Sequence, residues 1–209
     1  MPKSALVTGV GRTRGIGAAI ARGLAQDGWS LGLSYHEGYD RRVHSEPSDV
    51  ELLAVELRER GSRVALLPGD LEDVRVPPVL VDRCRAKLGT LNGLVMSHCE
   101  SVDSSLLSTT VESFDRHYAV NVRATWLLIK AFAEQVGPGG GCIIGLTSDH
   151  TVHNLPYGAT KGALNRVVLA ATHELADRGV RANVICPGFV RTSLVDITGC
   201  SPSGRRSRA

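Results

Sequence analysis

Short apolar runs alternate along the chain with longer segments in which apolar residues recur at helical spacing. The runs predict strands and the longer segments predict helices, because side chains three or four positions apart share one face of a helix. The expected strands are 5–7, 30–34, 63–67, 93–96, 142–146 and 181–185, and the expected helices are 16–27, 48–60, 79–88, 109–132 and 157–178. Non-alternating strands separated by helices are typical of a parallel sheet that is covered on both faces. We therefore expect an α/β fold, a three-layer doubly wound parallel sheet of the Rossmann type.

Residues with capping chemistry mark the ends of several expected helices. Ser48 with Glu51 has the spacing of a capping box, and so has the pair at 109 and 112, in which side chains bond unpaired N–H groups of the first turn. Glycine often closes a helix because it adopts left-handed backbone readily, and Gly61 and Gly179 stand at such positions. These residues predict where the helices beginning near 48 and 109 start, and where those ending near 60 and 178 stop.

Size and composition indicate one folded domain. The chain has 209 residues, of which 43% are hydrophobic and 22% charged, and this is ordinary globular usage. We place a dinucleotide-binding and catalytic domain at 1–192 and a truncated or flexible tail at 193–209, since SPSGRRSRA has too little apolar content to pack. The formal net charge is +3, which equals the contribution of the tail's three arginines, so nothing indicates a nucleic-acid partner.

The start of the chain and its cysteines predict a cytoplasmic protein. MPKSALVTG has too short an apolar run for a signal peptide or a membrane span, so we expect no membrane partner. The five cysteines include no C-x-x-C pair, and we expect them to be reduced thiols. His150 and His153 could share a metal ion, but no third ligand of suitable spacing stands nearby, so we expect no metal site.

A glycine-rich segment, TGVGRTRGIG at 8–17, lies where the first expected strand meets the first expected helix. Glycine permits a tight turn and the close approach of a pyrophosphate, whose charge is then met by free N–H groups and the positive end of the helix. A plain tight turn is the alternative. We expect this segment to bind a dinucleotide through Gly9, Arg14, Gly15, Ile16 and Gly17.

The end of the second expected strand bears on the choice of dinucleotide. An acidic residue there would accept hydrogen bonds from the adenosine ribose and would repel a 2′-phosphate. The chain has Tyr35 and His36 at this place, and we expect both to contact the cofactor. Arginines that could meet phosphate oxygens, or could equally be solvated surface charges, stand at Arg12, Arg14, Arg41 and Arg42. We therefore expect NADP(H) to be preferred, with NAD(H) possible.

Tyr157 and Lys161 stand four residues apart at the start of an expected helix and so share one face. A free phenol has a pKa of about 10, and a nearby positive charge such as Lys161 would favour the phenolate. Ser148 follows the fifth strand at the carboxyl edge of the sheet, where ligands gather, and could hold a substrate oxygen. Asn121 is polar in an otherwise apolar helical stretch. Its alternative role is that of a buried polar group that distorts the helix.

Together these motifs resemble those of the short-chain dehydrogenase/reductase family. The glycine segment resembles the family's TGxxxGxG motif with two additional residues before Gly-Ile-Gly, and the segment 187–192 resembles the stretch after its sixth strand. The catalytic tetrad of that family resembles Asn121, Ser148, Tyr157 and Lys161. The resemblance implies that a nicotinamide exchanges a hydride with a carbon bearing oxygen while Tyr157 gives or takes the proton of that oxygen.

The resemblance also implies a role for each site residue. Lys161 would lower the pKa of Tyr157 and hold the nicotinamide ribose, Ser148 would orient the carbonyl, and Asn121 would keep a water in a proton relay. Asp70 would contact the adenine ring. The remaining cofactor contacts that it implies are Leu71, Tyr157, Lys161, Pro187, Gly188, Val190 and Thr192. A homo-oligomer is suggested as well, formed through the helices around 109–135 and 157–178.

Three features depart from the family pattern. Met96–Cys99 replaces an Asn-Asn-Ala-Gly motif, so we expect the bulk of His98 and Cys99 to crowd the cofactor. Ser148 and Tyr157 are only nine positions apart, and Asp149 and His150 are alternative polar groups in this short loop. The chain also stops soon after Thr192, where the family continues with a helical cover and another strand. We therefore expect bare apolar surface and an unpaired sheet edge unless a partner subunit covers them.

The sequence thus predicts an oxidoreductase that transfers a hydride between NADP(H) and a carbonyl or secondary alcohol, resembling carbonyl reductases and 3-oxoacyl-thioester reductases. The alternative is a non-catalytic dinucleotide-binding protein or a truncated remnant.

Overall fold

The computed structural model describes residues 3–45, 47–149, 154–188 and 190. Six strands form one sheet in the order β3-β2-β1-β4-β5-β6, and every neighbouring pair is parallel. The strands are β1 (Ser4–Thr8), β2 (Ser30–Tyr35), β3 (Val64–Pro68), β4 (Gly93–Met96), β5 (Gly141–Leu146) and β6 (Val180–Ile185). The predicted doubly wound α/β fold is confirmed, with the reversal of strand order between β1 and β4.

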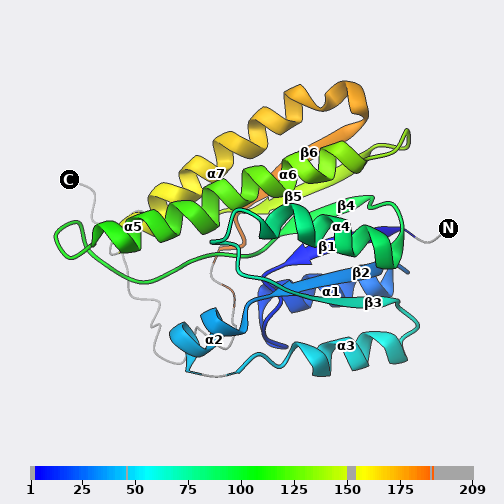
Figure 1. Ribbon diagram of the computed structural model, residues 1–209, viewed down its shortest axis with the longest axis horizontal. Coiled ribbons are helices and arrows are strands. Elements are labelled where there is room, and N and C mark those ends of the chain that lie inside the picture. Colours follow the sequence, from blue (N-terminus) through cyan, green and yellow to red (C-terminus); the bar gives the residue numbers. More distant parts are fainter. Residues whose placement is uncertain (1–2, 46, 150–153, 189, 191–209) are drawn as a thin grey trace, which may run out of the picture.

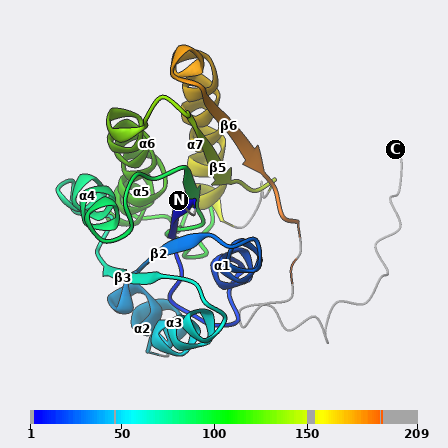
Figure 2. The same ribbon diagram turned by 90° about the vertical axis from the view of Figure 1, so that its right-hand side faces the viewer.

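Helices connect the strands and lie on both faces of the sheet (Figures 1 and 2). The α-helices are α1 (Ile16–Gln26), α2 (Glu37–His44), α3 (Val50–Glu59), α4 (Val76–Leu88), α5 (Val111–Tyr118), α6 (Ala124–Gln135) and α7 (Leu155–Glu174). A π-helical turn, η1 (Ala119–Arg123), joins α5 to α6, and a short 3-10 helix, η2 (Ala176–Arg178), follows α7. None of the described helices is both long enough and apolar enough to cross a membrane.

The core consists of two apolar clusters, one on each face of the sheet. On one face, α4, α6 and α7 pack residues such as Leu80, Phe132 and Leu164 against the strands. On the other face, α1 and α3 pack residues such as Ala21 and Leu53. All residues of β1 and β4 are buried, because both strands lie in the middle of the sheet between the two helical layers. This arrangement fixes the ends of β1 and β4 rigidly, side by side.

Strand β6 lies at one edge of the sheet and is covered on one face only. Its side chains alternate, so that Val180 and Ala182 are buried while Arg181 and Asn183 are exposed. Among the described residues, no further strand pairs with β6 and no helix covers the exposed side of this strand. The expected unpaired edge is therefore present in the described part of the chain.

Two helix starts differ from the sequence prediction. The Ser48 hydroxyl donates to the carbonyl oxygen of Gly11 at 2.6 Å, and Asp49 precedes α3 without a side-chain cap, so the capping box predicted there is wrong. Helix α5 is capped by Thr110, whose hydroxyl accepts a hydrogen bond from the Ser113 N–H at 3.2 Å, and not by Thr109. In both places a neighbouring polar residue competes for the same role, which spacing alone does not resolve.

Candidate active site

A cavity of about 400 Å³ opens at the carboxyl edge of the sheet. It lies where β1 and β4 end, at the reversal of strand order where open parallel sheets bind ligands. Its walls are the glycine turn after β1, the ends of β2 and β3, helix α2, residues 97–100 after β4, the end of β5 and the first turns of α7. The volume falls within the range of about 300–1,000 Å³ that is usual for small-molecule sites.

The glycine turn between β1 and α1 depends on the absence of side chains at two positions. Gly9 has a φ of +72°, and a Cβ there would lie 2.6 Å from the backbone of His98. A Cβ at Gly17 would lie 2.8 Å from the carbonyl oxygen of Gly9. The turn therefore packs backbone against backbone, and it leads into α1 at Gly15, which provides no side-chain cap. The N–H groups of the first turn of α1 thus face the cavity mouth without a capping side chain.

Tyr157 and Lys161 both line the cavity from the first turns of α7. The Nζ atom of Lys161 lies 5.5 Å from the centre of the Tyr157 ring and donates to the carbonyl oxygen of Leu146 at 2.8 Å. Ser148, just beyond β5, lies outside the cavity wall, and its side chain is close enough to Tyr157 to lower the pKa of that phenol. The structure therefore brings three of the four residues predicted to be catalytic into one contact group, although the loop between Ser148 and Tyr157 is short.

The pKa values in this group differ from the expectation that Lys161 lowers the pKa of Tyr157. Burial raises the pKa of Tyr157 well above its ordinary value, the nearby thiol of Cys99 adds to the rise, and the hydrogen bond from Ser148 acts in the opposite direction. Burial also lowers the pKa of Lys161. Desolvation disfavours the charged form of either group, and it is the largest cause of both shifts. Tyr157 is therefore a neutral phenol at neutral pH, a form that can donate a proton.

Asn121 lies outside the cavity lining, within the π-helical turn η1, and is fully buried. Its Oδ1 accepts a hydrogen bond from the Glu100 N–H at 2.7 Å, and its Nδ2 donates to the Glu100 carbonyl at 2.9 Å and to Thr160 Oγ1 at 2.9 Å. The backbone carbonyl of Asn121 accepts from the Thr125 hydroxyl. The structure therefore favours the alternative role, that of a buried polar group in a distorted helix. The Asn121 side chain attaches the segment after β4 to α7, the helix that carries Tyr157.

His98 borders the cavity, but its ring is held by protein groups on both sides. Nδ1 lies 2.6 Å from Thr8 Oγ1, and Nε2 lies 3.2 Å from the carbonyl oxygen of Val120. Burial, assisted by the charge of Lys161, lowers the pKa of His98 to about 3. The ring is therefore neutral, so that Thr8 donates to Nδ1 and Nε2–H donates to Val120. The bulk of His98 ties the end of β1 to η1, while Cys99 remains in the cavity wall.

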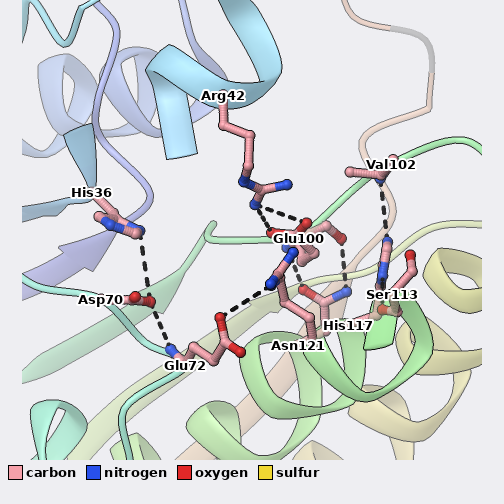
Figure 3. Close-up of polar contacts among 10 residues, drawn as sticks. His36, Arg42, Asp70, Glu72, Glu100, Val102, Ser113, His117 and Asn121 are labelled. Atoms are coloured by element: carbon pink, nitrogen blue, oxygen red, sulfur yellow. Dashed lines mark hydrogen bonds and ion pairs between the residues drawn. The ribbon is translucent and has the colours of Figure 1, made fainter. Parts of the chain in front are cut away.

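Two arginines of the cavity wall are paired with carboxylates. The Nε of Arg12 lies 3.5 Å from Asp40 Oδ1, and Arg42 donates from Nη2 to both carboxylate oxygens of Glu100, at 2.9 and 2.7 Å. Figure 3 shows the side chain of Arg42 reaching from α2 to Glu100, which in turn contacts Asn121. The guanidinium groups predicted to meet phosphate oxygens thus reach the site already engaged with acids.

The cavity gathers most of the residues predicted to bind the cofactor. Those in its wall are Gly9, Gly15, Ile16, Gly17, Tyr35, His36, Asp70, Leu71, Tyr157, Lys161 and Pro187. His36 and Asp70 lie together, with Nδ1 and Oδ1 3.6 Å apart (Figure 3).

A few predicted residues lie outside the wall. These are Arg14 and Arg41, both exposed, together with Gly188 and Val190. Arg41 instead pairs with Glu37 on the same helix at 2.6 Å. Thr192, His150 and His153 lie outside the described residues. The four described cysteines are unpaired.

The sequence reasoning missed α2 and the acid that it contacts. Helix α2 buries only Asp40 among its residues, so it has no apolar periodicity to reveal it. The spacing of Glu37 and Arg41, four apart with the acid first, is the one signal that could have indicated a helix. Glu100 follows β4 by four residues, and no motif in its neighbourhood indicates that its carboxylate pairs with Arg42, which is 58 positions away in the sequence.

Comparison with known proteins places this geometry in a family. The family model described as enoyl-(acyl carrier protein) reductase matches residues 9–204. An uncharacterized oxidoreductase, YjdA of Bacillus subtilis, is 31% identical over 193 residues, covering 89% of the chain and 74% of that protein.

Solved structures agree with that match. A short-chain dehydrogenase from Burkholderia cenocepacia in complex with NADP aligns with a TM-score of 0.83 and 30% identity, covering 95% of this chain and 78% of the other. A blue fluorescent protein from a metagenomic library, in complex with NADPH, aligns with a TM-score of 0.82 and 30% identity, covering 94% and 78%.

Proposed function

This chain belongs to the short-chain dehydrogenase/reductase family of oxidoreductases, and from that premise we propose that it transfers a hydride between NADP(H) and a carbonyl or secondary alcohol. The observation that carries the proposal is the contact of Tyr157 with Lys161 in the wall of the same cavity as the glycine turn, with the side chain of Ser148 next to Tyr157. We propose that the substrates include 3-oxoacyl thioesters or simple ketones.

The residues in the cavity wall fit a nicotinamide dinucleotide. The uncapped start of α1 and the glycine turn would receive the pyrophosphate, and Asp70 and Leu71 would border the adenine. Lys161 uses one ammonium proton on Leu146, which leaves two donors for ribose hydroxyls. When bound, the nicotinamide supplies or accepts the hydride.

The protein's own contribution to the reaction is a positioned proton. Tyr157 is neutral because burial raises its pKa, so its hydroxyl donates a proton to a substrate oxygen that gains negative charge. Ser148 contacts the same hydroxyl and would hold the substrate oxygen beside it. This arrangement favours carbonyl reduction over alcohol oxidation at neutral pH, because oxidation requires the phenolate.

A comparison of the protein with a Tyr157→Phe variant tests the reaction. We expect NADPH absorbance to fall when ketones or acetoacetyl thioesters are added, and the variant to lose about 10²–10⁴-fold in kcat while it still binds the cofactor. Equal rates in protein and variant would contradict the proposal. Calorimetric titration distinguishes the alternative of a non-catalytic binding protein, which would bind NADPH without any turnover.

The proposed preference for NADP(H) has two supports. No carboxylate ends β2, where Tyr35 and His36 stand, and two structural relatives at 30% identity hold NADPH or NADP. We expect a higher kcat/KM with NADPH than with NADH, and we expect His36→Asp to shift the ratio toward NADH. A ratio below one in the unaltered protein would contradict the preference.

A homo-oligomer is proposed on the exposed apolar residues of the helices that flank the site. Val111 on α5 is 72% exposed, Trp126 on α6 is 51% exposed and Leu169 on α7 is 47% exposed. Light scattering on the purified protein tests this, with Trp126→Glu as the variant expected to lower the measured mass. A monomer at micromolar concentration would contradict it.

The cytoplasm is the proposed location, in keeping with the unpaired cysteines.

A further inference from the structure

Helix α2 forms one wall of the cavity, yet almost nothing apolar holds it there. Neither apolar cluster of the core contains a residue of α2, and the buried residue that the helix does contribute is Asp40. Apolar burial is the main source of stability for most helices in proteins. An eight-residue helix without it depends on its polar contacts, and it belongs to the parts of a fold that open most readily.

Three polar contacts attach α2 across the mouth of the cleft. Asp40 lies beside the glycine turn, with its carboxylate facing Arg12 at 3.5 Å. Tyr39 lies close to the thiol of Cys99, and Arg42 donates two hydrogen bonds to Glu100. The helix thus bridges the glycine turn on one side and the segment after β4 on the other. A dinucleotide lies between these two segments in folds of this kind.

The Arg42–Glu100 pair is the strongest of these contacts. Its hydrogen bonds are charged on both sides, and the carboxylate side chain is only 4% exposed while the guanidinium side chain is 43% exposed. Glu100 is fixed in place because Asn121 bonds both its N–H and its carbonyl. Glu100 is therefore held in one position, whereas the partly exposed Arg42 side chain can move into solvent or bind another anion.

We propose that Arg42 and Glu100 are affinity-determining residues of the dinucleotide site, because their ion pair latches α2 over the cleft and a phosphate-bearing dinucleotide enters by replacing it. This inference rests on the proposed dinucleotide site. A phosphate group competes with the Glu100 carboxylate for Arg42, since both bind a guanidinium through the same geometry. The latch opens before or during binding, and its free energy is subtracted from the affinity of the cofactor.

Rapid-mixing fluorescence with NADPH tests the latch in Glu100→Gln and Arg42→Gln. Glu100→Gln keeps the shape of the side chain and removes its charge, and we expect it to raise the association rate and the affinity about tenfold, which corresponds to ~1.4 kcal/mol. Arg42→Gln also opens the latch but removes the guanidinium that the phosphate would bind, so we expect it to lower the affinity. The double variant should match Arg42→Gln, because Glu100→Gln has no ion pair left to break once Arg42 is absent.

Arg41→Gln is the matched control, since it removes the same charge from the same helix but breaks only the exposed pair with Glu37. We expect it to leave the association rate unchanged. Hydrogen exchange without cofactor provides a second measurement, in which Glu100→Gln should speed exchange within 37–44 and leave β1 unaffected.

Several outcomes would overturn the latch. These are an association rate in Glu100→Gln equal to or below that of the unaltered protein, an equal gain in Arg41→Gln, additive effects in the double variant, or unchanged exchange in α2. Failure of the unaltered protein to bind either NADPH or NADH would instead overturn the proposed function, and the exchange measurement would still decide whether the latch exists.

Discussion

Asn121→Ala removes a buried amide that makes three hydrogen bonds, and the structure allows the cost to be worked out group by group. The Glu100 N–H and the Glu100 carbonyl lose their Asn121 partner, at 2.7 and 2.9 Å. A buried polar group left without a partner costs about 1–3 kcal/mol. Thr160 loses little, because its hydroxyl still donates to the carbonyl oxygen of Pro156 or Tyr157. We expect a loss of about 4 kcal/mol in the free energy of unfolding.

That loss is a large share of the stability of an ordinary domain, which is about 5–15 kcal/mol, so the variant should fold but unfold in much less urea. The measurement is the unfolding midpoint at constant slope. Asn183→Ala is the matched control, because Asn183 lies on the exposed side of β6 and should change stability by less than about 0.5 kcal/mol.

This experiment distinguishes the two possible roles of Asn121, structural support of Glu100 and a direct part in proton transfer. If Asn121 supports Glu100, the Asn121→Ala variant loses mainly stability, and the fraction that stays folded keeps most of its activity. A variant as stable as Asn183→Ala whose turnover nevertheless collapses would refute the support role, and would return Asn121 to a direct part in proton transfer.

Three further predictions concern pH and capping. His98 has its pKa lowered to about 3, below the ordinary value of about 6.5, so the unfolded chain binds the extra proton first. Stability should therefore fall as pH drops from about 6.5 toward 3, and His98→Gln should flatten that slope in urea titrations; equal slopes would contradict it. Because burial raises the pKa of Tyr157, the rate of alcohol oxidation should increase with pH, and the rate of carbonyl reduction should stay constant from about pH 7 to 9. A fall in the reduction rate over that range would contradict neutral Tyr157 as the proton donor. Thr110→Ala should cost about 1 kcal/mol through the lost cap of α5, measured by thermal unfolding, and no change would show that the cap is redundant.

The fold class and most of the site followed from local patterns in the sequence. Strands β1 and β4 are buried on both faces and read as unbroken apolar runs, and their glycine and polar ends lie at one edge of the sheet. Tyr157 and Lys161 share a helix face by spacing alone. Such features need no knowledge of distant contacts, which is why the fold class and the meeting of these residues could be predicted.

Features that depend on distant partners could not be predicted. The pKa of Tyr157 is set by burial and by a thiol that is far away in the sequence, so a rule based on its neighbour Lys161 gave the wrong direction. Helix α2 is stabilised by residues such as Arg12 and Glu100, and no pattern within 37–44 reveals them. The π-helical turn at Asn121 forms where the side chain finds partners on two other segments.

The walls of the cavity come from segments spread between Gly9 and Pro187. During translation, a nascent chain therefore has no complete pocket until α7 and the end of β6 have left the ribosome, so a dinucleotide cannot template the early steps of folding. Afterwards, a ligand that binds only the folded chain adds about 2.7 kcal/mol at a hundredfold excess over its Kd. A dinucleotide that binds as proposed would therefore also protect the folded chain from proteolysis.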